Sequence, residues 1–232
     1  MSRGWFITGT DTGVGKTRVA ERLLRALVQQ GGHAVGMKPV ASGCRITDAG
    51  LRSEDAERLL AAGNVPADYV DVNPCAFAPA IAPHLAARAE NTDIGPERIL
   101  ESFRRLRERA DWIVVEGVGG WKVPLGERLM LADVVRAMQL PVIVVVGLRL
   151  GCLNHALLTI EAIQRDDMAL AGWVANRIDP HMERADENIA ALESRITAPL
   201  LTGFPYESPG HDNASNPVFP MSALRRLKQM AD

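Results

Sequence analysis

The residues with the clearest chemical meaning run from Gly9 to Thr17 and read Gly-Thr-Asp-Thr-Gly-Val-Gly-Lys-Thr. They follow a short apolar run, Trp5 to Ile7, and precede a stretch with helical periodicity. A glycine-rich turn between a strand and a helix that opens with Lys-Thr is the context of a phosphate-binding loop. Its glycines let backbone N–H groups approach phosphate oxygens, and the helix N-terminus adds positive charge. In such a loop Lys16 reaches the outer phosphates and the Thr17 hydroxyl binds Mg²⁺.

The loop departs from the common pattern in its spacing. Five residues separate Gly9 from Gly15, where the usual motif has four. The residue five positions before Lys16 is Asp11. Some related ATPases that act as dimeric switches carry a second lysine there, so the negative charge of Asp11 argues against a switch of that kind.

Two charged residues end otherwise apolar runs that we expect to be buried strands. Lys38 ends the run that begins at Ala34, and Glu116 ends the run that begins at Trp112. Charged side chains are rarely buried unless they are paired or bind a metal. Glu116 is placed like the acidic residue that holds Mg²⁺ in phosphate-loop enzymes. The alternatives are a salt bridge at the rim of the sheet for Glu116 and a surface lysine for Lys38.

The alternation of apolar runs and helical patterns predicts an α/β fold. The strands are expected at Trp5–Thr8, Ala34–Lys38, Trp112–Glu116, Val142–Val146, Leu170–Ala175 and Leu200–Gly203. The helices are expected at Lys16–Gln30, Ser53–Ala62, Pro96–Ala110, Leu131–Met138, Leu153–Gln164 and Met182–Ser194. This order indicates one domain over residues 1–232, with a mostly parallel sheet of about seven strands and helices on both faces, as in P-loop NTPases. In such sheets ligands bind beyond the carboxyl ends of the strands.

One segment departs from this alternation of strands and helices. Residues 64–95 contain Pro66, Pro74, Pro79 and Pro83 and show little periodicity, so we expect them to be irregular. Long irregular stretches inside a domain are often functional, and a plain surface loop is the alternative. The tail after Tyr206 (Pro209, Gly210, Asn213, Asn216 and Pro217) is also expected to be irregular, followed by a short closing helix.

Composition limits the other function classes. The chain has 232 residues, 47% of them hydrophobic, and a formal net charge of −2, which offers no basis for binding nucleic acid or a membrane surface. The basic cluster at 104–109 fits a solvated helix face. Three widely spaced cysteines contain no Cys-x-x-Cys pair, so neither a disulfide framework nor a zinc site is expected. Isolated thiols and the lack of a signal-peptide pattern favour the cytoplasm.

The chain resembles the dethiobiotin synthetase family. The resemblance lies in segments that occur in order along most of the chain, namely Thr8–Thr17, Lys38–Gly43, Gly50–Ala56, Val72–Pro74, Val115–Trp121, Gly151–His155 and Ala171–Asn176. It fades after about Tyr206. Members of this family use CO₂ and ATP to close a ureido ring on 7,8-diaminopelargonic acid, giving dethiobiotin, ADP and phosphate. The resemblance implies a carbamate, then a carbamic–phosphoric anhydride, and then ring closure by the second amine.

The resemblance also implies the partners and the residue roles. It implies Mg²⁺, ATP as co-substrate, and a homodimer whose active sites are shared between subunits. Catalysis is assigned to Thr12, Lys16 and Lys38. The metal ligands are Thr17, Asp55 and Glu116. Nucleotide contacts are assigned to Gly13, Val14, Gly15, Lys16, Thr17, Arg18, Asp55, Glu116, Gly117, Val118, Gly119, Asn176, Arg177, Pro205 and Tyr206. Among these, Asn176 reads the adenine edge, and Arg177 has no defined role. Thr12, Lys38 and Ser42 bind the substrate, and Gly151, Cys152, Leu153 and Asn154 hold its carboxylate from the neighbouring subunit.

Two other functions are alternatives to this one. A regulatory or partitioning ATPase shares the fold and the phosphate loop, but Asp11 and the absence of an amphipathic membrane-binding tail argue against it. An amidotransferase-type ligase usually needs an ammonia-producing module, for which 232 residues leave no room.

Overall fold

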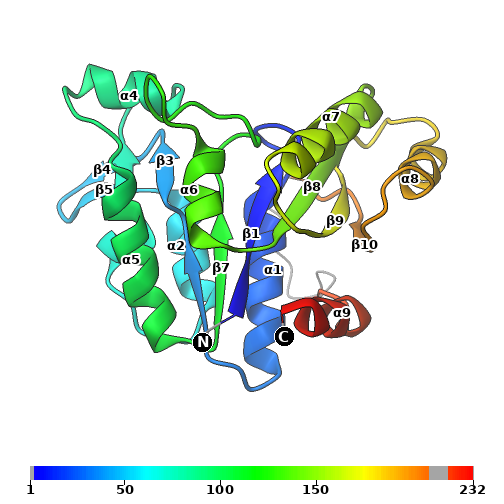
Figure 1. Cartoon of the computed structure of the whole chain (residues 1–232), viewed down its shortest axis with the longest axis horizontal. Coiled ribbons are helices and arrows are strands. Elements are labelled where there is room, and N and C mark those ends of the chain that lie inside the picture. The colour runs from blue at the N-terminus through cyan, green and yellow to red at the C-terminus, as the bar shows by residue number, and fades with distance from the viewer. Residues whose placement is uncertain (1–2, 209–218, 232) are drawn as a thin grey trace.

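The computed structural model describes residues 3–208 and 219–231. Its centre is a six-stranded sheet in the order β10-β9-β8-β1-β7-β2, and all of its strand pairs are parallel (Figure 1). The strands are β1 (Arg3–Gly9), β2 (Ala34–Met37), β7 (Trp112–Glu116), β8 (Val142–Leu148), β9 (Leu170–Arg177) and β10 (Leu200–Phe204). The ends of each strand lie within two residues of those predicted from the sequence.

Helices cover both faces of this sheet (Figure 1). One face carries α1 (Lys16–Gln29), α2 (Glu54–Ala62) and α9 (Met221–Ala231), and the other carries α5 (Pro96–Arg109), α6 (Leu131–Met138) and α7 (Cys152–Arg165). The remaining long helix, α8 (Ala185–Glu193), packs beside α7. Successive residues of β1 enter different cores, because Phe6 packs with the α5–α7 side whereas Trp5 and Ile7 pack with α1. The predicted α/β architecture is confirmed.

The expectation of an irregular segment at 64–95 is wrong in part. This segment contains α3 (Tyr69–Val72), β6 (Cys75–Phe77) and α4 (Pro83–Ala89). Strand β6 pairs in parallel with β3 (Val40–Ser42), which follows β2. A hairpin of β4 (Arg45–Thr47) and β5 (Gly50–Arg52) precedes α2. These elements are too short for periodicity to reveal, and Pro83 begins α4 rather than breaking it, because the first helical position needs no N–H donor.

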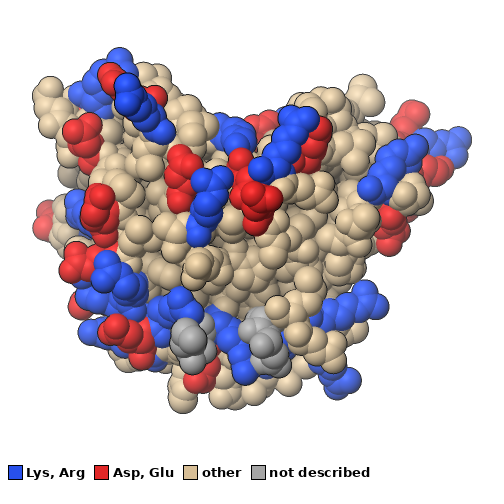
Figure 2. Space-filling model, viewed as in Figure 1, with Lys and Arg blue, Asp and Glu red and all other residues tan. Residues whose placement is uncertain are grey.

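Two features of the surface complete the fold. Acidic and basic side chains are interspersed over the face in Figure 2, as the small net charge suggests. Within the described ranges, no helix combines the length and apolar character needed to cross a membrane.

The tail residues Pro209, Gly210, Asn213, Asn216 and Pro217 lie outside the described residues, and the closing helix predicted after them is α9.

Candidate nucleotide and metal site

The phosphate loop joins β1 to α1 at the carboxyl edge of the sheet. Gly13 and Gly15 have φ angles of 73° and 92°, in the left-handed region that favours glycine. A Cβ atom on Gly15 would lie 2.2 Å from Nδ2 of Asn176, so a side chain cannot be accommodated there. Helix α1 begins at Lys16 and has no acidic residue in its first turn, which leaves the positive end of its dipole available to an anion. Lys16 Nζ donates a hydrogen bond to the carbonyl oxygen of Asp11 at 2.9 Å.

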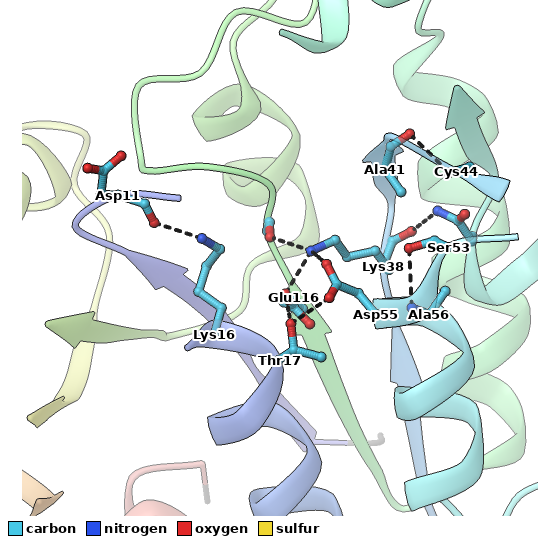
Figure 3. A network of polar contacts seen from close by, with 12 residues as sticks. Asp11, Lys16, Thr17, Lys38, Ala41, Cys44, Ser53, Asp55, Ala56 and Glu116 are labelled. Carbon is cyan, nitrogen blue, oxygen red and sulfur yellow. Dashed lines mark hydrogen bonds and ion pairs between the residues drawn. The ribbon is translucent and has the colours of Figure 1, made fainter. Parts of the chain in front are cut away.

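A compact polar network lies beside the loop (Figure 3). Lys38 Nζ is 2.7 Å from Asp55 Oδ2 and 2.7 Å from Glu116 Oε1, and it donates to the carbonyl oxygen of Gly117 at 3.2 Å. Thr17 Oγ1 lies 2.8 Å from Asp55 Oδ1 and 2.9 Å from Glu116 Oε1. A hydroxyl has one hydrogen, so Thr17 donates to one carboxylate at a time. The fold thus gathers four predicted site side chains, those of Thr17, Lys38, Asp55 and Glu116, beside the backbone of a fifth predicted site residue, Gly117.

Local structure explains how two of these side chains are aimed. Ser53 caps α2 by accepting a hydrogen bond from the N–H of Ala56, which places Asp55 in the first helical turn. A carboxylate is favoured there by the helix dipole. Lys38 follows β2. Its backbone is held by hydrogen bonds to Val72, the last residue of α3, and to Asn73, the residue that follows α3. Its N–H donates to the carbonyl of Val72 at 2.7 Å, and its carbonyl accepts from Asn73 Nδ2 at 2.7 Å.

The charges in this network are strongly perturbed. Lys38 is 3% exposed and Glu116 is 1% exposed. Burial opposes the charge on Lys38, but the negative charges of Glu116 and Asp55 outweigh it, so the pKa of Lys38 is raised. Burial raises the pKa of Glu116, against the opposing effect of Lys38. Burial, followed by repulsion from Lys38, lowers the pKa of Lys16 to about 8. Such shifts concentrate at functional sites.

The oxygens of Thr17, Asp55 and Glu116 fit a hard divalent cation. The second carboxylate oxygen of Glu116, Oε2, is buried and has no hydrogen-bond partner among the described residues. The described part of the chain holds no group of three or more His, Cys, Asp and Glu side chains that would form a metal cage. Two carboxylates and one hydroxyl suit Mg²⁺, which keeps several waters and takes phosphate oxygens as further ligands.

The loop after Glu116 lies against the phosphate loop. Gly117 donates its N–H to the carbonyl of Ile7 at 2.9 Å. Gly119 has a φ of 60°, and a Cβ there would lie 3.8 Å from Thr12 Oγ1. Val118 between them is half-buried, and Thr12 is exposed. The structure therefore brings the loop of Gly117, Val118 and Gly119 close to Thr12. Ser42 ends β3, and its Oγ is buried without a hydrogen-bond partner in the described part of the chain.

The residues predicted to contact the base also converge. Asn176 in β9 is 2% exposed. Its Nδ2 donates to the carbonyl of Val14 at 2.8 Å, and its Oδ1 accepts from Arg18 Nη1 at 2.8 Å. The same Arg18 nitrogen donates to the carbonyl of Pro205 at 3.0 Å. Asn176 therefore ties β9 to the phosphate loop, a role that sequence reasoning did not assign to it.

Two neighbours of this group, Arg177 and Tyr206, were also predicted from the sequence to contact the nucleotide. Tyr206, which follows Pro205, is 39% exposed. Arg177 Nη2 lies 2.5 Å from Asp186 Oδ1 of α8. The structure therefore gives Arg177 an ion pair that connects β9 to α8, and the sequence had suggested no partner for it.

The segment from Gly151 to Asn154 opens α7, just beyond β8. Gly151 has a φ of 94°, and both it and Asn154 are exposed, whereas Cys152 is buried and Leu153 is half-buried. Arg149, two residues before this segment, lies 2.5 Å from Asp11 of the phosphate loop. Sequence reasoning missed Arg149, because its partner is 138 residues away and no motif marks the pair. His155, which follows Asn154 in α7, is also exposed.

These features define a phosphate-loop nucleotide-binding protein of the α/β class. The family model described as "AAA domain" matches residues 3–212. The chain is 52% identical over 204 residues to the ATP-dependent dethiobiotin synthetase BioD of Aromatoleum aromaticum, covering 88% of this chain and 91% of the relative. It is also 52% identical over 202 residues to the protein of that name from Pseudomonas aeruginosa, covering 87% of this chain and 89% of the relative. The chain belongs to the ATP-dependent dethiobiotin synthetase family.

Solved structures show the same fold at much lower identity. The MinC:MinD cell division protein complex of Aquifex aeolicus matches with a TM-score of 0.61 and 15% identity, over 99% of this chain and 95% of that chain. The septum site-determining protein MinD of Pyrococcus horikoshii, complexed with Mg-ADP, matches with a TM-score of 0.54 and 17% identity, over 89% of this chain and 82% of that chain. At such identities the likeness shows the fold alone.

Proposed function

We propose that this protein is a dethiobiotin synthetase, which uses ATP to convert 7,8-diaminopelargonic acid and CO₂ into dethiobiotin, ADP and phosphate. The observation that carries the proposal is the convergence of Lys16, Thr17, Lys38, Asp55 and Glu116 at one sheet edge, in a chain about half identical to enzymes of that name. It is a C–N bond-forming ligase, which we place in the cytoplasm.

The reaction proceeds in three steps. One substrate amine adds to CO₂ and loses a proton, giving a carbamate. A carbamate oxygen then attacks the γ-phosphorus of ATP and expels ADP, giving a carbamic–phosphoric anhydride. The second amine attacks the carbon of the anhydride, expels phosphate and loses a proton, which closes the ureido ring. Phosphoryl transfer depends chiefly on positioning and charge neutralisation. The site offers the positively charged side chains of Lys16 and Lys38 for this purpose.

Each group of residues has a part in this reaction. Lys16 holds the outer phosphates together with the N–H groups of the phosphate loop. Lys38, kept fully charged by its two carboxylate neighbours, stabilises the negative charge on the carbamate and the transferring phosphoryl group. Thr12 and Ser42 hydrogen-bond the carbamate end of the substrate, and the buried Oγ of Ser42 supports this role. When bound by Thr17, Asp55 and Glu116, Mg²⁺ neutralises phosphate charge.

We further propose that the enzyme works as a homodimer with shared sites. Gly151 and Asn154 are exposed at the start of α7, so their groups are accessible to a second molecule. Exposed N–H groups at the start of a helix favour a carboxylate, which suits the acid end of the substrate. In this arrangement Gly151, Cys152, Leu153 and Asn154 of one subunit hold the carboxylate of the substrate bound at its neighbour's phosphate loop.

A phosphate-release assay tests the proposal. Purified protein with Mg²⁺ and ATP should release phosphate only when diaminopelargonic acid and bicarbonate are both present. Omitting either one gives the matched control. Phosphate release of the same rate without the diamine would contradict the synthetase function and favour a switch-type ATPase.

A further inference from the structure

The guanidinium of Arg18 covers the two acceptors at the base end of the site. Its Nη1 nitrogen donates to Asn176 Oδ1 at 2.8 Å and to the carbonyl oxygen of Pro205 at 3.0 Å. Nη1 carries two hydrogens in the plane of the guanidinium, so one nitrogen can serve both acceptors. Asn176 is 2% exposed; one hydrogen of its amide nitrogen is bonded to the carbonyl of Val14, and Oδ1 is the acceptor that it presents to Arg18.

This geometry matches the chemistry of an exocyclic amino group. The amino group of adenine is also a planar nitrogen with two donor hydrogens, and it would use the same pair of acceptors. The amino group and Arg18 Nη1 are therefore competitors for Asn176 Oδ1 and the Pro205 carbonyl. A 6-keto purine presents an acceptor at that position instead, and two bare acceptors would repel it. A guanidinium has only donors, so a position covered by Arg18 attracts a keto oxygen.

We propose that Arg18 sets the base selectivity of the nucleotide site and broadens it. An amino-purine nucleotide must displace Arg18 Nη1 from its two acceptors, which weakens its binding. A keto-purine nucleotide leaves one of these two hydrogen bonds in place, because its keto oxygen accepts only one of the two Nη1 hydrogens. The proposal rests on the proposed function only in placing the purine between Asn176 and Pro205.

The surroundings of Arg18 show what keeps it at this position. Its guanidinium lies over the ring of Phe204 at 5.1 Å and forms an ion pair with Glu207. These contacts remain available when Nη1 gives up its two acceptors, so the displacement requires a small movement and not the loss of a buried charge pair. Arg22 shares both partners, because it lies over Phe204 at 4.6 Å and donates to both oxygens of Glu207 at 2.7 and 3.0 Å. Arg22 donates to neither Asn176 nor Pro205 in the described structure.

The test compares ADP with IDP, whose bases differ only at the 6-position and its adjoining N1 proton. Calorimetry with Mg²⁺ and no diamine gives the ratio of the two dissociation constants, Kd(IDP)/Kd(ADP). In Arg18→Met, which keeps an apolar stem over Phe204, this ratio should rise at least about tenfold above wild type, the scale expected for an acceptor pair left facing a keto oxygen. The matched control Arg22→Met removes the same charge from the same Glu207, and its ratio should equal that of wild type.

The possible outcomes separate this inference from the function on which it rests. A ratio unchanged or lowered in Arg18→Met, or raised equally in Arg22→Met, would overturn the role of Arg18 and leave the synthetase reaction intact. Failure of the wild-type protein to bind either nucleotide would overturn both. If Arg18→Met does not fold, Arg18→Lys replaces it, because lysine keeps the charge beside Glu207 but loses the planar pair of N–H groups. Its ratio should also rise, and an unchanged ratio would contradict the inference.

Discussion

The ammonium group of Lys38 lies 2.7 Å from Oε1 of Glu116, and both side chains are almost completely buried. A buried ion pair of this kind contributes little net stability when it is intact, but removing one partner leaves an unpaired buried charge. The pair therefore links activity to stability at this position. A lysine at the end of a strand would by itself suggest a substitution that the fold tolerates easily, and the burial of Glu116 changes that expectation.

Lys38→Ala should lower turnover by about two to three powers of ten, the scale expected for the loss of one electrostatic stabiliser. It should also destabilise the fold by about 3 kcal/mol, because Glu116 loses its partner. Steady-state kinetics and denaturant unfolding measure the two effects. The double variant Lys38→Met/Glu116→Gln removes both charges, so it should recover most of the stability and none of the turnover. Wild-type turnover in Lys38→Ala would show that this lysine has no part in the reaction.

Glu116→Gln should raise the Mg²⁺ concentration needed for half-maximal activity, because a neutral amide is a poorer ligand for a hard cation than a carboxylate. Binding of the diamine in the absence of nucleotide should stay the same. The matched control is Glu108→Gln, an exposed residue on α5. An Mg²⁺ titration identical to wild type in Glu116→Gln would exclude this residue from the metal site.

ATP binding should take up a proton in alkaline buffer. The pKa of Lys16 is lowered to about 8 in the free protein, and bound phosphate raises it again. Before ATP binds, Lys16 is about nine-tenths neutral at about pH 9 and about one-tenth neutral at about pH 7. ATP binding should therefore take up about 0.9 proton at about pH 9 and about 0.1 proton at about pH 7. ATP affinity therefore falls as pH rises above 8. Calorimetry in buffers of different ionisation enthalpy measures the uptake, and an absence of uptake at the higher pH would contradict this role for Lys16.

Two inactive variants should rescue each other if the active sites are shared. Lys16→Ala disables the phosphate loop of its own chain. Gly151→Pro/Asn154→Ala disables the carboxylate site, because proline cannot adopt the φ of 94° at Gly151. Co-expression in equal amounts makes about half of the dimers mixed, each with one intact site, so about a quarter of wild-type activity should return. Activity no higher than the mean of the two parents, with mixed dimers shown to form, would place the carboxylate site within its own chain.

The sequence was sufficient for the parts of this protein in which local chemistry and topology agree. Long apolar strands and the phosphate loop have strong local signals, and parallel strands bring Lys38 and Glu116 to one edge without further information. The short elements between Val40 and Phe77 were missed, because three- and four-residue segments have no measurable period. The contacts of Arg149 with Asp11 and of Arg18 with Asn176 were missed because they join positions 138 and 158 residues apart through side chains that no motif relates.

The fate of labelled carbon tests the central claim most directly. The protein is incubated with ATP, Mg²⁺, diaminopelargonic acid and ¹³C-bicarbonate, and the products are quantified by mass spectrometry and by the release of phosphate. The synthetase function predicts dethiobiotin that carries the label in its ureido carbon, with one ADP and one phosphate formed for each molecule. Formation of ADP and phosphate with no labelled dethiobiotin would contradict it.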